Sequence, residues 1–125
     1  MNKFIFALLF FCNAAFAEPV LIMLTGEMID NGEVIEQENQ NGYFLYPHRK
    51  CRLPIVHAKE MRGYVFMVNG KPNIYGCYAR LLNGNIMTID SDGSKFSSPA
   101  FGYSEAKLMN GELKMLKAFD QGELK

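Results

Sequence analysis

The fold of this chain is decided by residues 63–93, which read GYVFMVNGKPNIYGCYARLLNGNIMTIDSDG. Apolar runs at residues 63–68, 73–82 and 86–89 are separated by Asn-Gly pairs, and an Asp-Gly pair follows the last run. Asn and Gly tolerate the positive φ angles that a tight hairpin turn needs. The pattern predicts an antiparallel meander of hairpins, which residues 94–97 close with a further short strand.

The sequence before this stretch indicates more strands. Residues 20–24 form a continuous apolar run of strand length. Asp30-Asn31-Gly32 is a strong turn signal, and residues 33–36 return as a short strand, so we expect a hairpin here. Residues 42–46 give another strand, which we expect to stop at Pro47.

Two segments favour helix. Residues 58–61 have helix propensity and are expected to make a turn or two. Ser104 stands before residues 105–109 as an N-cap would, and residues 112–119 follow as a second helical stretch. The apolar side of that stretch carries Leu113, Leu116 and Phe119. The predicted fold class is therefore mainly β (α+β), with a short C-terminal helix.

The N-terminus has the pattern of a secretory signal peptide. Lys3 precedes an apolar run at residues 4–11, and Ala15-Phe16-Ala17 is the small-x-small pattern after which signal peptidase cuts. The run is shorter than the ~20 residues of a spanning helix. We expect residues 1–17 to be removed and residues 18–125 to form a single small domain in the periplasm or outside the cell. The alternatives are an N-terminal membrane anchor and lipidation at Cys12.

Cysteine usage points to one disulfide. Once residues 1–17 are removed, Cys51 and Cys77 remain in an oxidising compartment, where a pair of cysteines usually bridges. A bridge across this span would stabilise the fold by about 3.5 kcal/mol in the chain-entropy model. The alternative is a free thiol that acts with His48 or His57. The spacing of these four residues matches no common zinc site, so we expect no bound metal.

The stretch from Cys51 to Phe101 resembles a group of small exported proteins of unknown function from bacteria and from phage or prophage genomes. The shared elements are Cys51, Gly76-Cys77-Tyr78, an apolar strand at residues 86–89, and Asp92-Gly93. Here Tyr78 stands where the group has Trp. The resemblance implies the disulfide and the meander, and it brings no known activity.

Charge is balanced over the chain but unevenly placed. The 13 Lys and Arg equal the 13 Asp and Glu, and removal of Lys3 leaves 12 − 13 = −1, which argues against a general nucleic-acid binder. Residues 27–38 hold five acids and no base, whereas residues 48–62 hold five Lys or Arg and one acid. Either the surface has two signs and steers a charged partner, or the two segments neutralise each other or are simply solvated.

Five residues are candidates for partner binding. The basic segment around Cys51 contributes three, and the strand at residues 74–78 contributes two tyrosines on opposite faces. Tyrosine suits contact surfaces and also the margins of small cores. The candidates are Arg49, Lys50, Arg52, Tyr75 and Tyr78.

No motif commits the chain to catalysis. Asp90-Ser91-Asp92-Gly93 begins like a calcium loop, but the further ligands and the distal Glu do not follow, so we expect a hairpin turn. Gly-x-Ser-x-Gly, His-Glu-x-x-His, the P-loop and Gly-x-Gly-x-x-Gly are all absent. We expect no catalytic residues and no cofactor.

These features predict an exported, non-enzymatic interaction module of the bacterial envelope. The resemblance suggests that a phage or prophage encodes it. It would bind a protein or a cell-wall component. The first alternative is a periplasmic inhibitor of a hydrolase such as lysozyme, with residues 48–54 as the inserting loop. A small envelope enzyme and a self-associating structural subunit are further alternatives.

Overall fold

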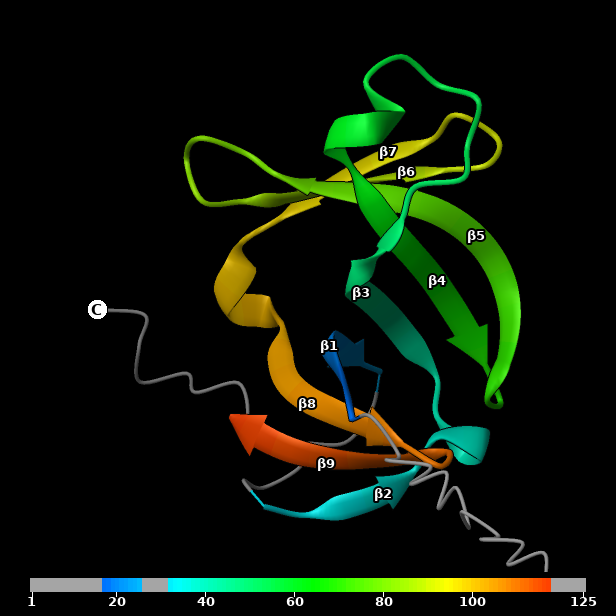
Figure 1. The fold of residues 1–125 in the computed structure, drawn as a ribbon, viewed down its shortest axis with the longest axis vertical. Coiled ribbons are helices and arrows are strands. Elements are labelled where there is room, and N and C mark those ends of the chain that lie inside the picture. The colour runs from blue at the N-terminus through cyan, green and yellow to red at the C-terminus, as the bar shows by residue number, and fades with distance from the viewer. Residues whose placement is uncertain (1–16, 26–31, 118–125) are drawn as a thin grey trace, which may run out of the picture.

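The computed structural model describes residues 17–25 and 32–117, which form one antiparallel sheet of nine strands (Figure 1). The order across the sheet is β2-β9-β8-β1-β3-β4-β5-β6-β7. The strands are β1 (Glu18–Leu24), β2 (Val34–Glu36), β3 (Gly42–Lys50), β4 (Arg62–Val68), β5 (Lys71–Arg80), β6 (Ile86–Asp90), β7 (Lys95–Ser98), β8 (Ser104–Met109) and β9 (Glu112–Lys117). Three 3₁₀ turns connect them: η1 (Gln37–Asn39), η2 (Ala58–Glu60) and η3 (Ala100–Gly102).

The middle strands of the sheet, β1, β3 and β4, are buried on both faces. Successive side chains of a strand point to opposite faces, and here each face has its own core. The first core gathers alternate residues of these strands with residues of β8 and β9: Val20, Ile22, Phe44, Tyr46, Val65, Met67, Ala106, Leu113 and Met115. The second gathers the intervening positions of β3 and β4 with residues of β5 and β6 and with the residue that precedes β8: Leu45, Tyr64, Tyr78, Ile86 and Tyr103. The sheet therefore folds over its own centre on both sides.

The predicted meander is confirmed from β4 to β7, and β3 extends it by one strand whose pairing was not predicted. Each of these strands pairs with the next in the sequence in antiparallel register. Asn69 and Gly70 have φ angles of 51° and 72°, as the Asn-Gly signal requires. The expectation that the strand of residues 42–46 stops at Pro47 is wrong, because β3 continues to Lys50. The helical turn expected near residue 58 is the single 3₁₀ turn η2.

The predicted C-terminal helix is wrong. Ser104–Met109 and Glu112–Lys117 are strands β8 and β9, joined in a hairpin. Asn110 and Gly111 have φ angles of 52° and 77° and form the turn. Burial has a period of two, because Leu113 and Met115 are buried whereas Leu116 is exposed. The same Asn-Gly chemistry that makes the β4–β5 turn thus overrides the helix propensity of the flanking residues. Phe119 lies outside the described residues.

The predicted N-terminal hairpin is also wrong. β1 pairs with β3 and β8, and β2 pairs with β9. β1 is apolar on both faces, which suits a strand with neighbours on both sides and a core on each face. The N–H of Gly32 already donates to the carbonyl of Met115 on β9, so the chain has reached another strand before β2 begins. Asp30 and Asn31 lie outside the described residues.

The predicted signal peptide lies outside the described residues except for Ala17. β1 starts at Glu18, the residue that follows the predicted cleavage site. Over residues 17–25 and 32–117, no helix is long and apolar enough to cross a membrane.

Candidate functional site

A bulge at the end of β3 shapes the surface that carries the basic segment. Tyr46 pairs with Gly63, and the next aligned pair is Lys50 with Arg62, so three residues of β3 face a single step of β4. Pro47 opens this bulge, as fits a residue without an N–H to donate to the ladder. Bulges bend a strand and redirect its side chains. Here the bulge interrupts the ladder after Tyr46, and pairing resumes at Lys50.

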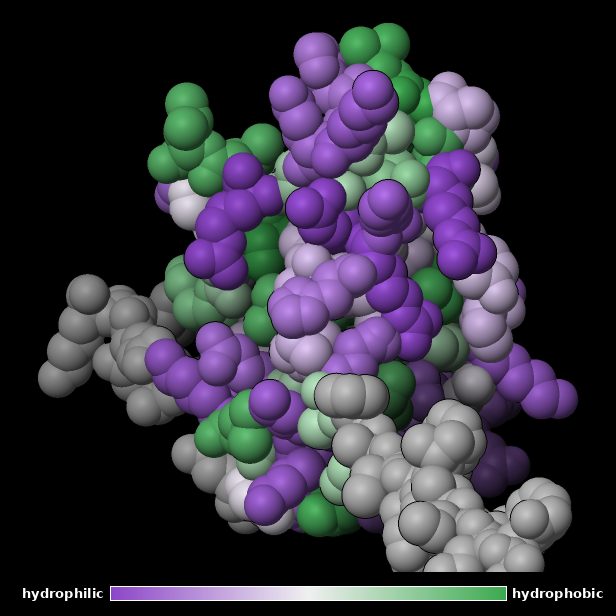
Figure 2. Space-filling view, in the orientation of Figure 1, coloured by the Kyte–Doolittle hydropathy of each residue, from purple (hydrophilic) through white to green (hydrophobic). Residues whose placement is uncertain are grey.

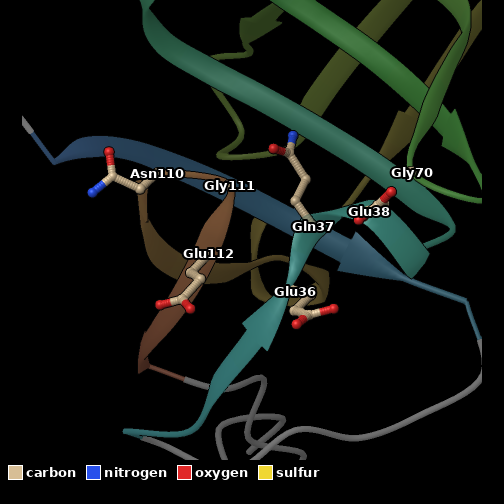
Figure 3. A pocket seen from close by; sticks show the side chains of 7 residues that line it. All are labelled: Glu36, Gln37, Glu38, Gly70, Asn110, Gly111 and Glu112. Atoms are coloured by element: carbon tan, nitrogen blue, oxygen red, sulfur yellow. The ribbon is translucent and has the colours of Figure 1, made fainter.

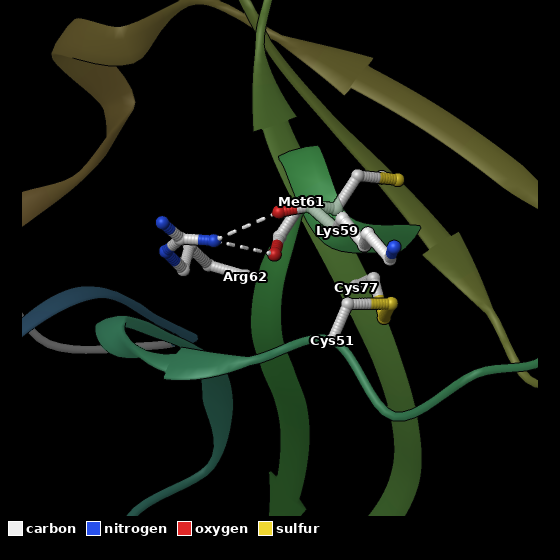
Figure 4. The surroundings of a disulfide bond; sticks show 5 residues. All are labelled: Cys51, Lys59, Met61, Arg62 and Cys77. Carbon is white, nitrogen blue, oxygen red and sulfur yellow. Dashed lines mark hydrogen bonds between the residues drawn. A yellow bond between two sulfur atoms is a disulfide. The ribbon is translucent and has the colours of Figure 1, made fainter. Parts of the chain in front are cut away.

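The bulge places two cations opposite each other. Lys50 and Arg62 are Cα partners on adjacent antiparallel strands, and both are exposed. Like charges directly opposite on a sheet destabilise it. The guanidinium of Arg62 donates from Nη1 to the carbonyls of Met61 at 3.1 Å and Lys59 at 3.4 Å, which holds it against η2 (Figure 4). The arrangement concentrates positive charge at a cost in stability.

The disulfide anchors the same segment. Cys51 follows β3 directly and is bonded to Cys77 in β5, as predicted, with the Cα atoms 5.2 Å apart (Figure 4). Cys77 is fully buried. The chain after the bulge is thereby fixed to a strand of the meander, and residues 52–57 leave from this fixed point as a loop.

Arg49 is committed to holding strands together. Its guanidinium forms an ion pair with the carboxylate of Glu18 in β1, with Nη2 to Oε1 at 2.6 Å and Nε donating to both oxygens at 2.8 and 2.9 Å. Its Cζ also lies 3.9 Å from the centroid of the Tyr46 ring. The hydrogen bond to Glu18 raises the pKa of Arg49 above its usual value. Arg49 therefore positions the bulge rather than offering a free charge.

The two candidate tyrosines have different environments. Tyr75 is 59% exposed, whereas Tyr78 is only 8% exposed and packs in the second core. Burial raises the pKa of Tyr78, and the positive charges of Arg62 and Arg80 partly oppose that rise. Tyr75 is thus available to a partner, and Tyr78 supports the fold beneath the basic residues.

Four of the five predicted binding residues line one hollow of about 600 Å³. Arg49, Lys50, Arg52 and Tyr75 share this hollow with residues of β3 and β4. Its remaining lining residues include Tyr46, His48, Cys51, Leu53, Gly63 and Tyr64. Arg49 is paired with Glu18, so the exposed cations that line this hollow together with Tyr75 are Lys50 and Arg52. The sequence had brought these residues together only as a charge cluster and a tyrosine-rich strand.

A second hollow, of about 660 Å³, has three lining residues in common with the first. It is lined by Pro47, His48, Lys50, Cys51, Ala58, Lys59 and Arg62. Lys59 and Arg62 were counted in the basic segment but not predicted as binding residues. The signal that could have found them is Pro47 inside a strand pattern, because it marks the bulge that aligns Lys50 with Arg62.

The basic and acidic segments lie at opposite ends of the long axis, with η2 near the top of Figure 1 and β2 at the bottom. Hydrophilic side chains gather around η2 and the end of β3 in Figure 2. At the other end, Glu36, Glu38 and Glu112 line a hollow of about 380 Å³ (Figure 3). This separation argues against mutual neutralisation of the two segments, and both a surface that steers a charged partner and simply solvated charges are compatible with it. Glu27 and Asp30 lie outside the described residues.

The Asp-rich turn is a hairpin turn, as predicted. Asp92 accepts a hydrogen bond from the N–H of Ser94 at 2.9 Å, and the N–H of Gly93 donates to the carbonyl of Asp90 at 2.9 Å. The carboxylate of Asp90 instead accepts a hydrogen bond from the hydroxyl of Tyr64. In the described part of the chain, no group of three or more His, Cys, Asp or Glu is placed to hold a metal ion.

Comparison with known proteins adds no relative: no family model, no curated protein and no solved structure matches this chain.

Proposed function

We propose that residues 18–125 form an exported, non-enzymatic binding module that works in the periplasm or outside the cell. The signal-peptide pattern of residues 1–17 supports export, and the Cys51–Cys77 disulfide fits an oxidising compartment. Mass spectrometry of the protein recovered from its producing cell tests this step. We expect an N-terminus at Glu18, and an intact Met1 would contradict export by cleavage.

The observation that carries the binding role is the convergence of Lys50, Arg52 and Tyr75 on one hollow. Two exposed cations beside a half-exposed aromatic ring can bind an anionic group and cover an apolar or planar one next to it. The hollow stands on fixed backbone, because the bulge and the disulfide hold it. The partner is an anionic protein or cell-wall component, in keeping with the predicted envelope role.

The lining groups favour binding over chemistry. Tyr46 and Tyr64 are buried, which raises the pKa of each phenol and keeps it protonated. Among the described residues of this hollow, none is Asp or Glu, Cys51 is bonded to Cys77, and the one histidine, His48, is exposed. A catalytic site needs a nucleophile and a base within hydrogen-bond reach.

The resemblance to small exported proteins of phage and prophage genomes supports a narrower version of this role. In it, the module blocks or tunes an envelope process of the host cell. The identity of the captured partner tests that version.

A crosslinking experiment tests the binding role. The disulfide-bonded protein is incubated with the envelope of its host, crosslinked and recovered, in parallel with Lys50→Glu/Arg52→Glu and with the matched control Lys95→Glu/Lys107→Glu. We expect one specific partner that the first variant loses and the control retains. Capture that is equal for all three proteins would contradict a role for the hollow.

One observation favours hydrolase inhibition as a second candidate. The predicted inserting segment, residues 48–54, is partly strand, but the loop that follows Cys51 carries Val56 with 81% exposure. A stapled loop with an exposed apolar side chain can enter an active-site cleft. Loss of inhibition on Val56→Asp and Arg52→Gln would support this function. Full activity of every cell-wall hydrolase tested with the unmodified protein would remove it.

A further inference from the structure

The two hollows beside the bulge adjoin each other. Both are lined by His48, Lys50 and Cys51. The first contributes Tyr75 and Arg52, and the second contributes Lys59 and Arg62. We call the two together the basic groove. It is one surface made of two hollows that have three lining residues in common.

Positive charge dominates this groove. Among the described residues that line its two halves, none is Asp or Glu. Glu18 neutralises Arg49 from β1, but the other cations of the groove keep their charge for solvent or a ligand. Lys50 and Arg62 remain opposite each other although this position costs stability. A ligand that carries several negative charges would relieve that repulsion.

We propose that the basic groove binds an anionic polysaccharide, whose acidic groups contact Lys50, Arg52 and Lys59 and one of whose sugar rings packs on Tyr75. The proposal rests on the binding role argued above and names the class of ligand. A polysaccharide with regularly spaced acidic groups can place several of them against the cations of the two hollows at the same time. Its pyranose rings have apolar C–H faces that fit the exposed tyrosine ring.

Other polyanions fit the groove less well. Single-stranded nucleic acid binds through several aromatic side chains on which successive bases stack, whereas Tyr75 is the one tyrosine of the groove that is more than half exposed among the described residues. A protein partner needs an interface core enriched in aromatic residues and Met and depleted in charge. The groove has the reverse composition, with one ring among several cations.

The test uses probes that share a backbone. Binding of the disulfide-bonded protein is measured by calorimetry with carboxymethyl-dextran, neutral dextran, poly-L-glutamate and oligothymidylate. We expect affinity for carboxymethyl-dextran that falls as salt is raised, because bound cations displace counterions from the polymer. We expect no binding of neutral dextran. No binding of carboxymethyl-dextran would overturn the proposal, as would tighter binding of poly-L-glutamate or oligothymidylate.

Two variants separate charge from ring packing. Lys50→Glu is expected to weaken binding of carboxymethyl-dextran by about tenfold or more. Its matched control is Lys107→Glu, because Lys107 is also exposed and also lies opposite a cation, here Lys114 on the next strand. Tyr75→Ser should weaken binding of the polysaccharide severalfold and leave the weak binding of poly-L-glutamate unchanged. Equal loss with both polymers would overturn the role of the sugar ring.

The outcome also separates this proposal from the binding role itself. If the crosslinking experiment captures a partner through Lys50 and Arg52 but carboxymethyl-dextran does not bind, the ligand class is wrong and the binding module remains. If neither experiment shows binding through these residues, both proposals fall.

Discussion

The basic and the acidic end of the molecule share one feature and differ in what holds it. At the basic end Lys50 faces Arg62, and at the acidic end Glu36 faces Glu112, so each end opposes like charges on adjacent strands. The basic pair sits on strands that form the cores and is fixed by a bulge and a disulfide. The acidic pair depends on β2, an edge strand of three residues. Both ends therefore oppose like charges, and they differ in how firmly the backbone beneath those charges is held. A site on rigid elements loses less conformational entropy when it binds.

The largest effect is expected when the disulfide that holds the basic end is removed. Cys51→Ser/Cys77→Ala removes the bridge across 26 residues and should lower the free energy of unfolding by about 3.5 kcal/mol. Urea denaturation measures this loss, and reduced wild-type protein should reproduce it. Hydrogen exchange should rise at residues 48–57 more than at the hydrogen bond from Gln37 N–H to the Gly111 carbonyl. Equal increases at both ends would show that the bridge does not specifically stiffen the basic end.

Two glycines, one at each end, give the next contrast. A Cβ at Gly76 would meet the carbonyl oxygen of Ile89 and would lie 2.7 Å from the Tyr64 ring, so Gly76→Ala should cost about 1–3 kcal/mol. A Cβ at Gly111 meets nothing within 4 Å, and only its φ of 77° opposes a side chain, so Gly111→Ala should cost about 1 kcal/mol. Urea midpoints of the two variants decide the matter. A smaller loss for Gly76→Ala would mean that β6 moves aside easily.

A smaller effect comes from reversing one charge in each like-charged pair. Lys50→Glu and Glu112→Lys each create an opposite-charge pair across two strands, so each should raise the free energy of unfolding by about 0.2–1 kcal/mol. The gain should shrink in high salt. Lys107→Glu, opposite Lys114, should gain a similar amount without affecting the groove. If Lys50→Glu is more stable and yet loses its partner, the repulsion at the basic end is retained for binding. A destabilised Lys50→Glu would contradict the opposed geometry.

The sequence predicted the meander and the disulfide because both depend on local chemistry. Asn-Gly pairs need positive φ, and two cysteines in an oxidising compartment pair. The same reasoning should have found the hairpin at Asn110-Gly111. It failed there because the residues on both sides are good helix formers with short apolar spacing, and a pattern of so few residues fits period two and period 3.6 alike. The position of β1 was hidden because strand order is set by long-range packing, which no local pattern records.

The candidate site was predicted in part. The sequence singled out Lys50, Arg52 and Tyr75 as binding candidates from charge and residue type, and the structure places all three in the lining of one hollow. Alternation placed Tyr75 and Tyr78 on opposite faces of their strand but could not show which face is buried. Tyr78 is buried by residues distant in the sequence, among them Tyr103. The alignment of Lys50 with Arg62 depends on the size of the bulge, and a bulge is a backbone feature that only Pro47 hints at.

The smallest expected effect concerns how the carboxyl group of Asp90 makes stability depend on pH. Burial, and then the charge of Asp92, raise the pKa of Asp90, whose carboxylate accepts the hydroxyl of Tyr64 in the wall of the first hollow. The folded state therefore holds this proton more tightly than the unfolded state. Its stabilising effect is full below the unfolded pKa of about 3.9 and is lost as pH rises through the folded value.

In the same turn, the pKa of Asp92 is shifted in the opposite direction to that of Asp90. The backbone N–H of Ser94 lowers the pKa of Asp92, so its stabilising effect is present above the unfolded pKa and is lost as pH falls. In Asp90→Asn the urea midpoint should therefore rise with pH across the acidic range, and in Asp92→Asn it should fall. Wild-type protein should lie between the two. If Asp90→Asn keeps the pH profile of the wild type, the Asp90 carboxyl is as well solvated as in the unfolded chain, and the wall of the groove at Tyr64 is wetter than its burial indicates.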